Sequence, residues 1–187
     1  VRLGHLDRGE EAIAVYDEVV KRYGDTPEAA LREEVAIALR NKGVRLCQLD
    51  RGEEAIAVYD EVVKRYGDAP EAALREEVAI ALNGWGFGLL CEAKKVWRGG
   101  DEATAIGTLK QALKKIEAAQ QREPNESIYL GNQGYILFLL GRVEEARPIL
   151  TKAIALGGEE LRQIELNDAD IHPLPQDKAF KALIESL

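Results

Sequence analysis

The sequence predicts an all-α protein, an α-solenoid of antiparallel helix pairs that ends in a C-terminal capping helix. Three observations lead to this fold class: a long internal repeat, apolar residues at helical spacing, and no alternation of the kind that predicts strands. Leu6–Leu39 recurs as Leu49–Leu82 at an offset of 43 residues, and the only change is Thr26 to Ala69. A single helix pair cannot bury its own apolar stripe, whereas stacked pairs can, so such a repeat predicts an array.

Each repeat is expected to form one longer and one shorter helix. The longer helix runs from about Pro27 to Leu49, and the shorter one from about Glu53 to Tyr66. Apolar residues of the shorter helix recur at intervals of three and four residues, which predicts one buried stripe. The members of this stripe are Ala55, Tyr59, Val62 and Tyr66. The corresponding stripe of the next longer helix is Leu74, Val78, Leu82, Trp85 and Leu89.

Local signals predict where these helices begin and end. Asp50 can accept hydrogen bonds from free N–H groups and is expected to start the shorter helix, whereas Gly67 suits a left-handed stop. Pro70 fits the first turn of the next helix, where its missing N–H group is not needed. Two exposed ion pairs are expected at a spacing of four residues, Glu61–Arg65 and Glu71–Arg75.

The composition suits a folded protein and argues against several classes of partner. Apolar residues make up 46% of the chain and charged residues 31%, which is not the composition of a disordered segment. The net charge of -8 repels phosphate, so we do not expect nucleic acid as a partner. The longest apolar run, Tyr135–Leu140, is too short to cross a bilayer, so we do not expect a membrane partner either.

Cysteine usage and the start of the chain bear on its compartment. Cys47 and Cys91 are too few for a disulfide framework, which favours a reducing, cytoplasmic compartment. Residues 1–6 contain Arg2 and His5 and lack the long apolar core of a signal peptide. Because the sequence contains no Met, we interpret it as a piece of a longer protein, so a signal sequence further upstream is left open.

The side chains that usually carry chemistry are few and scattered. The two histidines, His5 and His172, lie at opposite ends of the chain, so a catalytic triad or a zinc site is not expected. The repeated acidic pairs Glu53-Glu54 and Glu76-Glu77 are expected on solvated helix faces rather than in a desolvated cleft. We therefore predict that the protein is not an enzyme and binds no cofactor or metal.

Three closely spaced glycines, Gly84, Gly86 and Gly88, need a physical reason because glycine weakens a helix. A phosphate-binding loop follows a strand and opens a helix, but this run aligns with the middle of a helix, so nucleotide binding is not expected. Two interpretations are left open, close packing or a kink within the array, and close approach of a bound peptide.

Small and bulky residues recur at matching places in three repeats, and this pattern resembles the tetratricopeptide repeat (TPR) family. The residues that carry the resemblance are Gly43, Ala55, Tyr59 and Val62 in the second repeat, Gly86, Ala105, Leu109 and Ala112 in the third, and Gly134, Ala146, Leu150 and Ala153 in the fourth. The resemblance implies a right-handed solenoid. From the first glycine to the first alanine the third repeat has 19 residues, whereas the second and fourth have 12, so both of its helices are expected to be longer.

The resemblance covers a repeat array at residues 1–158, followed by a C-terminal capping segment at 159–187. The array divides into a partial repeat at about 1–25, repeats at 26–68 and 125–158, and an elongated repeat at 69–124. Gly157-Gly158 is expected to end the fourth repeat, Asn167–Pro175 to form a loop, and Gln176–Leu187 to form a last helix. Phe180, Leu183 and Ile184 lie on one face of that helix. Because the first repeat lacks the front of its first helix, we expect further repeats upstream.

In the TPR family the first helices of the repeats line the concave, ligand-binding surface. The resemblance places three sets of residues there: Arg40, Val44 and Cys47 in the second repeat, Asn83, Phe87 and Leu90 in the third, and Gly131, Tyr135 and Phe138 in the fourth. Lys, Arg and Asn at such positions clamp a terminal carboxylate in well-known members of the family, but here only Arg40 and Asn83 are of that kind. The remaining aromatic and apolar residues favour an amphipathic helix or an extended apolar segment as ligand.

Three functions are consistent with the sequence. The first is a protein–protein interaction scaffold that binds a peptide or helix of a partner on the concave face, through Arg40, Val44, Asn83, Phe87, Leu90, Tyr135 and Phe138. The second is a structural repeat protein that self-associates end to end, since nearly identical repeats can stack without closing. The third is an accessory segment of an enzyme whose catalytic domain lies elsewhere. The longer helices could also fold these side chains into an ordinary core.

Overall fold

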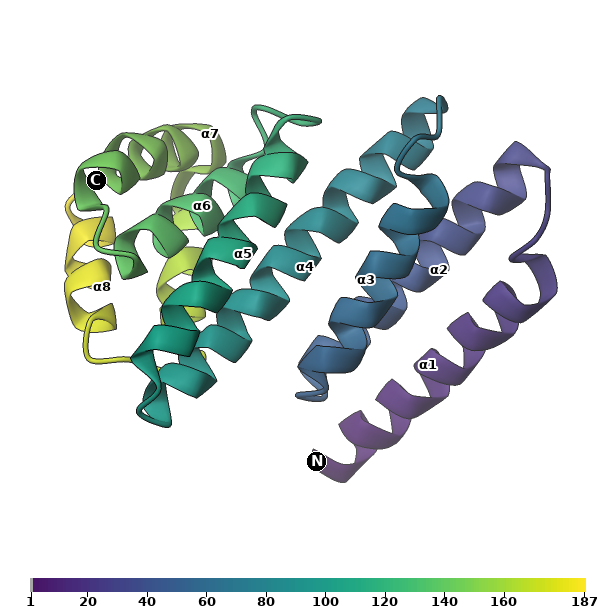
Figure 1. The fold of residues 1–187 in the computed structure, drawn as a ribbon, viewed down its shortest axis with the longest axis horizontal. Helices are drawn as coiled ribbons and strands as arrows, with labels where there is room; N and C mark the ends of the chain where they lie inside the picture. Colours follow the sequence, from purple (N-terminus) through teal and green to yellow (C-terminus); the bar gives the residue numbers. More distant parts are fainter. Residues whose placement is uncertain (1) are drawn as a thin grey trace. The chain divides into compact units, whose positions relative to one another are not determined.

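The computed structural model describes residues 2–187, with side chains from residue 8 onward. These residues form eight α-helices and no strand (Figure 1). The helices are α1 (Arg2–Tyr23), α2 (Ala29–Gln48), α3 (Gly52–Tyr66), α4 (Ala72–Arg98), α5 (Glu102–Gln120), α6 (Ser127–Leu139), α7 (Val143–Ala169) and α8 (Asp177–Glu185). The all-α fold of paired helices predicted from the sequence is confirmed. The side chain of His5, which was not expected to take part in a catalytic triad or a zinc site, lies outside the described residues.

The helices belong to two compact units, residues 1–88 and residues 89–187, and each is described by itself. We call them the N-terminal and the C-terminal unit. The chain passes from one to the other within α4. In the N-terminal unit α2 packs against both α1 and α3. The predicted stripe of α3 is confirmed, because its four members Ala55, Tyr59, Val62 and Tyr66 are all buried.

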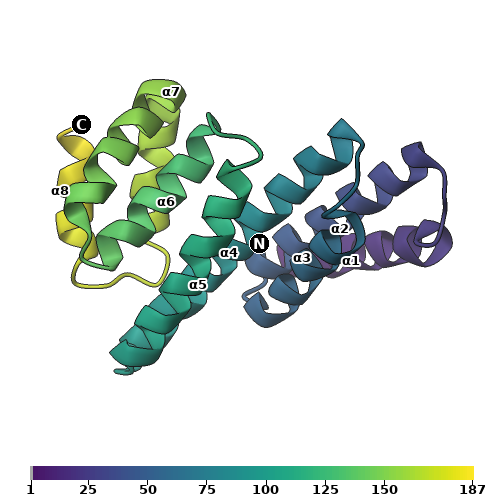
Figure 2. The same ribbon diagram turned by 45° about the horizontal axis from the view of Figure 1, so that its top comes forward.

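The C-terminal unit is built around α6 and α7, which pack along their lengths, with α5 against α6 and α8 against α7. Its core includes Leu109, Ile136 and Leu150, which are completely buried. The predicted apolar face of the last helix is also confirmed, since Phe180, Leu183 and Ile184 of α8 are buried. In Figure 2 α8, at the yellow end of the chain, lies beside α7.

The helices assigned to the third repeat are longer than their counterparts in the second. α4 has 27 residues where α2 has 20, and α5 has 19 where α3 has 15. The added turns of α4 carry Lys94, which takes part in the contacts described below.

The turns after α2 and α3 correct two predictions about helix ends. Asp50 has a φ of 61°, and the N–H group of Arg51 donates to the Leu46 carbonyl at 2.9 Å. This is the left-handed turn that closes a helix, so Asp50 ends α2 and does not cap α3. Gly141 closes α6 in the same way with a φ of 75°. Gly67, by contrast, has a right-handed φ of -56°, so its prediction as a left-handed stop was wrong.

The segment between the fourth repeat and α8 also differs from expectation. α7 bends at Gly158, whose φ of 63° and ψ of -152° are not helical, and then continues to Ala169. The predicted loop therefore begins three residues later than Asn167. The polar run there is typical of a loop, but Ala169 is completely buried, and tertiary packing of this kind overrides local propensity.

Ion pairs join helices where only local pairs were expected. Glu61 and Arg65 form the predicted pair at 2.5 Å. Glu71 instead pairs with Arg32 of α2 at 2.5 Å, and not with Arg75 one turn away on its own helix. Glu77 was expected on a solvated face, but it is only 9% exposed and pairs with Arg40 of α2. None of the described helices is long and apolar enough to span a bilayer.

Candidate functional site

The predicted binding residues lie on α2, α4 and α6, the first helices of their repeats. Arg40, Val44, Asn83 and Phe87 belong to the N-terminal unit, whereas Leu90, Tyr135 and Phe138 belong to the C-terminal unit. The two sets differ in their exposure to solvent, and so in what they can bind.

In the N-terminal unit the predicted residues are at least partly accessible. Val44 is 40% exposed, and Asn83 and Phe87 are half-buried. Arg40 is already engaged, because its Nε donates to Glu77 Oε2 at 2.7 Å. Burial raises the pKa of Glu77, and the Arg40 guanidinium works against that shift.

Two ion pairs fix α2 beside α4. Arg40–Glu77 is one, and Arg32–Glu71 is the other, with Arg32 Nη1 2.5 Å from Glu71 Oε1. The first runs from α2 to α4 and the second from α2 to Glu71, the residue just before α4, so these first helices of successive repeats lie next to each other. Val44 and Phe87, which occupy the same repeat position, therefore lie on neighbouring helices.

Tyr59 of α3 packs into the junction between α2 and α4 because glycine leaves room for it on both. A Cβ on Gly43 would lie 2.5 Å from Tyr59 Cε1, and a Cβ on Gly84 would lie 2.6 Å from Tyr59 Cζ. Close packing therefore accounts for Gly84. Gly88 meets only an ordinary contact, Ile56 Cγ1 at 3.5 Å.

In the C-terminal unit the predicted residues are covered. Leu90 and Tyr135 are each 1% exposed, and Phe138 is half-buried. Phe180 of α8 stacks on Tyr135 with ring centroids 4.2 Å apart, and it meets Phe138 at 5.3 Å. α8 therefore occupies the surface of α6 on which a ligand was expected.

A polar network anchors the same helix. Asp177, at the start of α8, accepts a hydrogen bond from the Tyr135 hydroxyl at 2.6 Å and pairs with Lys94 Nζ at 3.1 Å. Its second oxygen also accepts from the Leu174 N–H group at 2.7 Å. The Lys94 and Asp177 side chains are 2% and 4% exposed, so this ion pair is almost fully removed from water.

Lys94 also reaches the end of α7. Its Nζ donates to the Tyr135 hydroxyl at 2.5 Å and to the Ala169 carbonyl at 3.1 Å. Carbonyls at a helix C-terminus have no helical partner, so a buried ammonium is well placed there.

Burial lowers the pKa of Lys94, and Asp177 opposes the shift. Burial likewise raises the pKa of Tyr135, with a further contribution from Asp177. Lys94 was not predicted from the sequence, since nothing in the chain marks it as a partner of Asp177.

A second buried acid lies over α6. Glu165 is 1% exposed, and neither of its carboxylate oxygens accepts a hydrogen bond from the described residues. Its carboxylate fills the space that a Cβ on Gly131 would occupy. Burial raises the pKa of Glu165 to about 8, and nearby Asp168 adds to the shift. Burial also raises the pKa of Asp168 to about 6, against the effect of Lys94.

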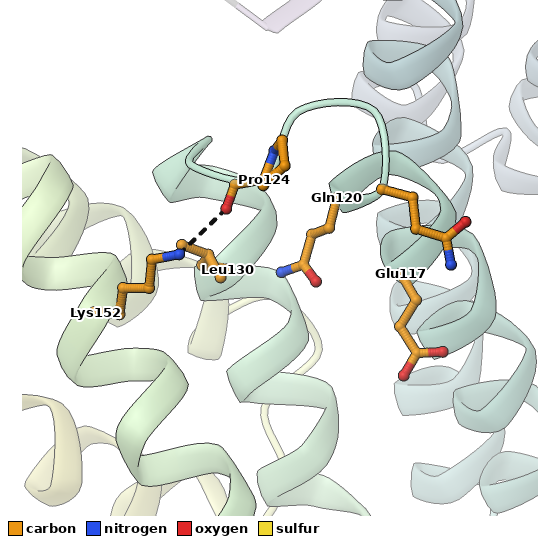
Figure 3. A pocket seen from close by; sticks show the side chains of 6 residues that line it. Glu117, Gln120, Pro124, Leu130 and Lys152 are labelled. Carbon is orange, nitrogen blue, oxygen red and sulfur yellow. Dashed lines mark hydrogen bonds between the residues drawn. The ribbon is translucent and has the colours of Figure 1, made fainter.

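One surface pocket of about 500 Å³ lies between α5, α6 and α7 (Figure 3). Its lining residues are Glu117, Gln120, Gln121, Pro124, Leu130 and Lys152. Lys152 Nζ faces the Pro124 carbonyl at 3.4 Å across one side of the pocket. None of the predicted binding residues lines this pocket, and its lining contains no cluster of catalytic groups.

The residues considered for chemistry do not converge in the described part of the chain. His172 lies half-buried in the turn before α8, with a φ of 48°. Cys47 and Cys91 form no disulfide, and both are half-buried. No group of His, Cys, Asp or Glu among the described residues has the arrangement of a metal site.

The comparison with known families decides the assignment. The tetratricopeptide repeat model matches residues 5–70 and 98–160, most of the chain. The chain belongs to the tetratricopeptide repeat family. The TPR pattern also explains two close contacts, Gly43 with Tyr59 and Gly134 with Leu150, in which the small residue of a first helix faces the bulky residue of the second.

A solved TPR structure has the same fold. The crystal structure of a thermophilic TPR protein from Thermus thermophilus superposes with a TM-score of 0.56 at 18% identity, covering 100% of this chain and 95% of that one. No curated protein sequence matches this TPR chain.

Proposed function

We propose that this TPR protein is a scaffold that binds a peptide or helix of another protein on the surface formed by α2 and α4. Repeats of this family are generally protein-interaction scaffolds, and its members are typically not enzymes. We call this surface the α2–α4 surface and define it by Arg40, Val44, Asn83 and Phe87. We propose no catalytic role and no cofactor for the chain.

The exposure of Val44 carries this proposal. It is 40% exposed on α2, and Phe87 at the same repeat position of α4 is half-buried. Partly exposed apolar side chains on two adjacent helices offer a partner area that gains free energy on burial, about 25 cal/mol per Å². The flanking Asn83 and the Arg40–Glu77 pair supply polar groups that can fix the orientation of a ligand.

Selection from a random peptide display library tests the proposal without a known partner. Peptides selected on the immobilised full chain should lose about tenfold or more in affinity when Val44→Glu or Phe87→Glu places a charge in the contact. Leu156→Glu is the matched control, because Leu156 is 50% exposed on α7 and belongs to the C-terminal unit. Selected peptides that bind all three variants equally, or a library that yields none, would count against the proposal.

Self-association is a second candidate, favoured by apolar exposure on α1. Val15 is 61% exposed and Tyr23 is 40% exposed, and their separation of eight residues puts them on the same side of the helix. A second copy could cover this strip. The double variant Val15→Glu/Tyr23→Glu should then remain a monomer by light scattering at concentrations where the wild-type mass grows.

A cytoplasmic, reducing compartment is part of the proposal. It is supported by the two cysteines, Cys47 and Cys91, which form no disulfide and are half-buried. Free thiols persist in reducing compartments, whereas secreted proteins tend to pair them. Fractionation of cells that express the tagged full-length protein would test this location.

A further inference from the structure

The same repeat position has a different environment in α6 than in α2 and α4. Val44, Phe87 and Tyr135 each directly follow the first-helix glycine of their repeat. Val44 is 40% exposed and Phe87 half-buried, whereas Tyr135 is 1% exposed. What covers Tyr135 is Phe180 of α8, at a centroid distance of 4.2 Å. α8 thus covers this position of α6, as a bound partner would cover the equivalent positions of the α2–α4 surface.

Two side chains make the principal contacts of α8 with this surface. Phe180 is completely buried against the rings of Tyr135 and Phe138. Three residues before it, Asp177 accepts from the Tyr135 hydroxyl at 2.6 Å and pairs with Lys94 at 3.1 Å. Residues three apart lie on the same face of a helix, so one acid and one aromatic ring form a compact recognition motif.

The receiving surface is complementary in both respects. Tyr135 and Phe138 offer aromatic area, and Lys94 offers a cation whose Nζ lies 5.0 Å from the Tyr135 ring centroid. A buried ammonium requires a carboxylate partner, since burying a charge without one is costly. Any helix that takes this place therefore has to bring an acid as well as an aromatic ring.

On its own α8 would be only a marginal helix, so its contacts with the rest of the C-terminal unit hold it in place. It has nine residues, and no side chain caps its N-terminus. Isolated helices shorter than about 12 to 15 residues are only marginally stable in water. Residues 170–176 connect it to α7, and they contain Pro173 and Pro175. Two further contacts hold α8: Arg162 of α7 donates to the Ile184 carbonyl, and Lys181 pairs with Asp170 at 2.6 Å. Its position depends on contacts of the kind that a ligand makes.

We propose that α8 is a built-in ligand of the surface formed by Lys94, Tyr135 and Phe138, and that the external partner of this surface is a helix with an acidic residue three positions before a phenylalanine, which binds by displacing α8. We call this surface the α8 seat. The inference rests on the proposed scaffold function and specifies the partner class for a second surface of the same protein.

Tethering gives α8 an advantage over any free competitor. Residues 170–176 hold α8 next to its seat, and tethering over so short a span gives a high effective concentration, so a free helix of similar intrinsic affinity is largely excluded. Weakening α8 should therefore open the seat to a free peptide of the same sequence.

The test uses a fluorescein-labelled peptide of residues 173–187 and the full chain. By anisotropy, the chain carrying Phe180→Ala should bind this peptide about tenfold or more tightly than the wild-type chain does, because its own α8 competes less well. Peptides that carry Asp177→Asn or Phe180→Ala are the matched controls and should bind the variant chain at least about tenfold more weakly than the native peptide. A folded Phe180→Ala chain that binds the native peptide no better than the wild type overturns the proposal.

Hydrogen exchange of the wild-type chain supplies a test that does not depend on a variant folding. Amides of Phe180–Ile184 should exchange about tenfold or more faster than those of Ile136–Leu139, because α8 opens locally while α6 stays folded. Equal exchange in the two segments would show that α8 leaves only when its unit unfolds, and would also overturn the proposal.

The two proposals fail in distinguishable ways. If display-selected peptides bind the α2–α4 surface but the α8 peptide does not bind the Phe180→Ala chain, only the built-in ligand is rejected. If the α8 peptide binds and no display peptide depends on Val44 or Phe87, the α2–α4 surface is rejected and the α8 seat stands.

Discussion

At the scale of single residues, the packing of the N-terminal unit depends on glycines that leave room for a large side chain. Gly43 and Gly84 leave the space that Tyr59 fills between α2 and α4. Glycine costs about 1 kcal/mol of helix propensity relative to alanine, so its presence in these helix interiors marks a contact that outweighs that cost.

Replacing Gly43 by alanine should show whether the close contact with Tyr59 outweighs the gain in helix propensity. Gly43→Ala puts a methyl group 2.5 Å from the Tyr59 ring and should lower the free energy of unfolding by about 1 to 3 kcal/mol. Gly107→Ala is the control, because Gly107 is exposed within α5 and a Cβ there meets nothing within 4 Å. It should raise stability by about 0.5 to 1 kcal/mol. Urea unfolding of both variants measures the difference, and a stabilising Gly43→Ala would contradict the packing argument.

Glu165 predicts an unusual pH dependence at the same scale. Its pKa of about 8 lies above the ordinary value of 4.5, so the folded chain binds a proton that the unfolded chain has released. Stability should therefore fall as the pH rises from about 4.5 to 8 and level off above that. Asp168, with a pKa of about 6, contributes a similar fall only at the acidic end of this range.

Glu165→Gln should remove most of this dependence between about pH 6.5 and 8.5, and make the chain more stable than the wild type at the alkaline end. Each kcal/mol gained should raise the melting temperature by about 2 to 4 °C. Glu160→Gln removes an exposed carboxylate of the same helix and should leave the wild-type dependence in place. Thermal melts at a series of pH values provide the measurement, and identical slopes for the wild type and Glu165→Gln would refute the assignment.

At the scale of elements, three long-range ion pairs connect helices. Arg40–Glu77 joins α2 to α4, Arg32–Glu71 joins α2 to the residue just before α4, and Lys94–Asp177 joins α4 to α8. The last pair differs from the others in being almost fully buried. Removing one partner of a buried pair is strongly destabilising, because it leaves an uncompensated charge in the interior.

Lys94→Met should therefore destabilise the C-terminal unit by about 3 kcal/mol, because it leaves the Asp177 carboxylate buried without its cation. Adding Asp177→Asn removes that uncompensated charge and should recover part of the loss. The free energy of urea unfolding, measured for the single and double variants, gives the coupling between the two residues. Additive effects would show that the ion pair contributes nothing beyond its separate residues.

At the scale of the whole molecule, net charge competes with the exposed apolar strip of α1. The chain carries a net charge of -8, so copies repel one another at low ionic strength. If Val15 and Tyr23 mediate self-association, raising the salt from about 0.01 to 0.15 M shortens the screening length from about 30 to 8 Å and should increase the mass seen by light scattering. A mass near 20.6 kDa at every salt and protein concentration would rule out that candidate.

Much of the fold could be predicted because its signals are local. The stripe of α3 and the apolar face of α8 follow from residues three and four apart, and both are buried as expected. Spacing between glycine and alanine also indicated the longer helices of the third repeat. The errors at Asp50 and Gly67 are local too, since a left-handed turn can use Asp and a glycine can adopt ordinary helical angles.

By itself, the sequence determined the helices, their repeat and the family, because helical periodicity and small–bulky pairs depend on short separations along the chain. Only the tertiary structure decided which predicted binding residues are open and which are covered. Tyr135 and Val44 hold the same repeat position, yet one is 1% and the other 40% exposed. The difference comes from Phe180, which is 45 positions beyond Tyr135 in the chain and meets it only when α8 folds back onto α6.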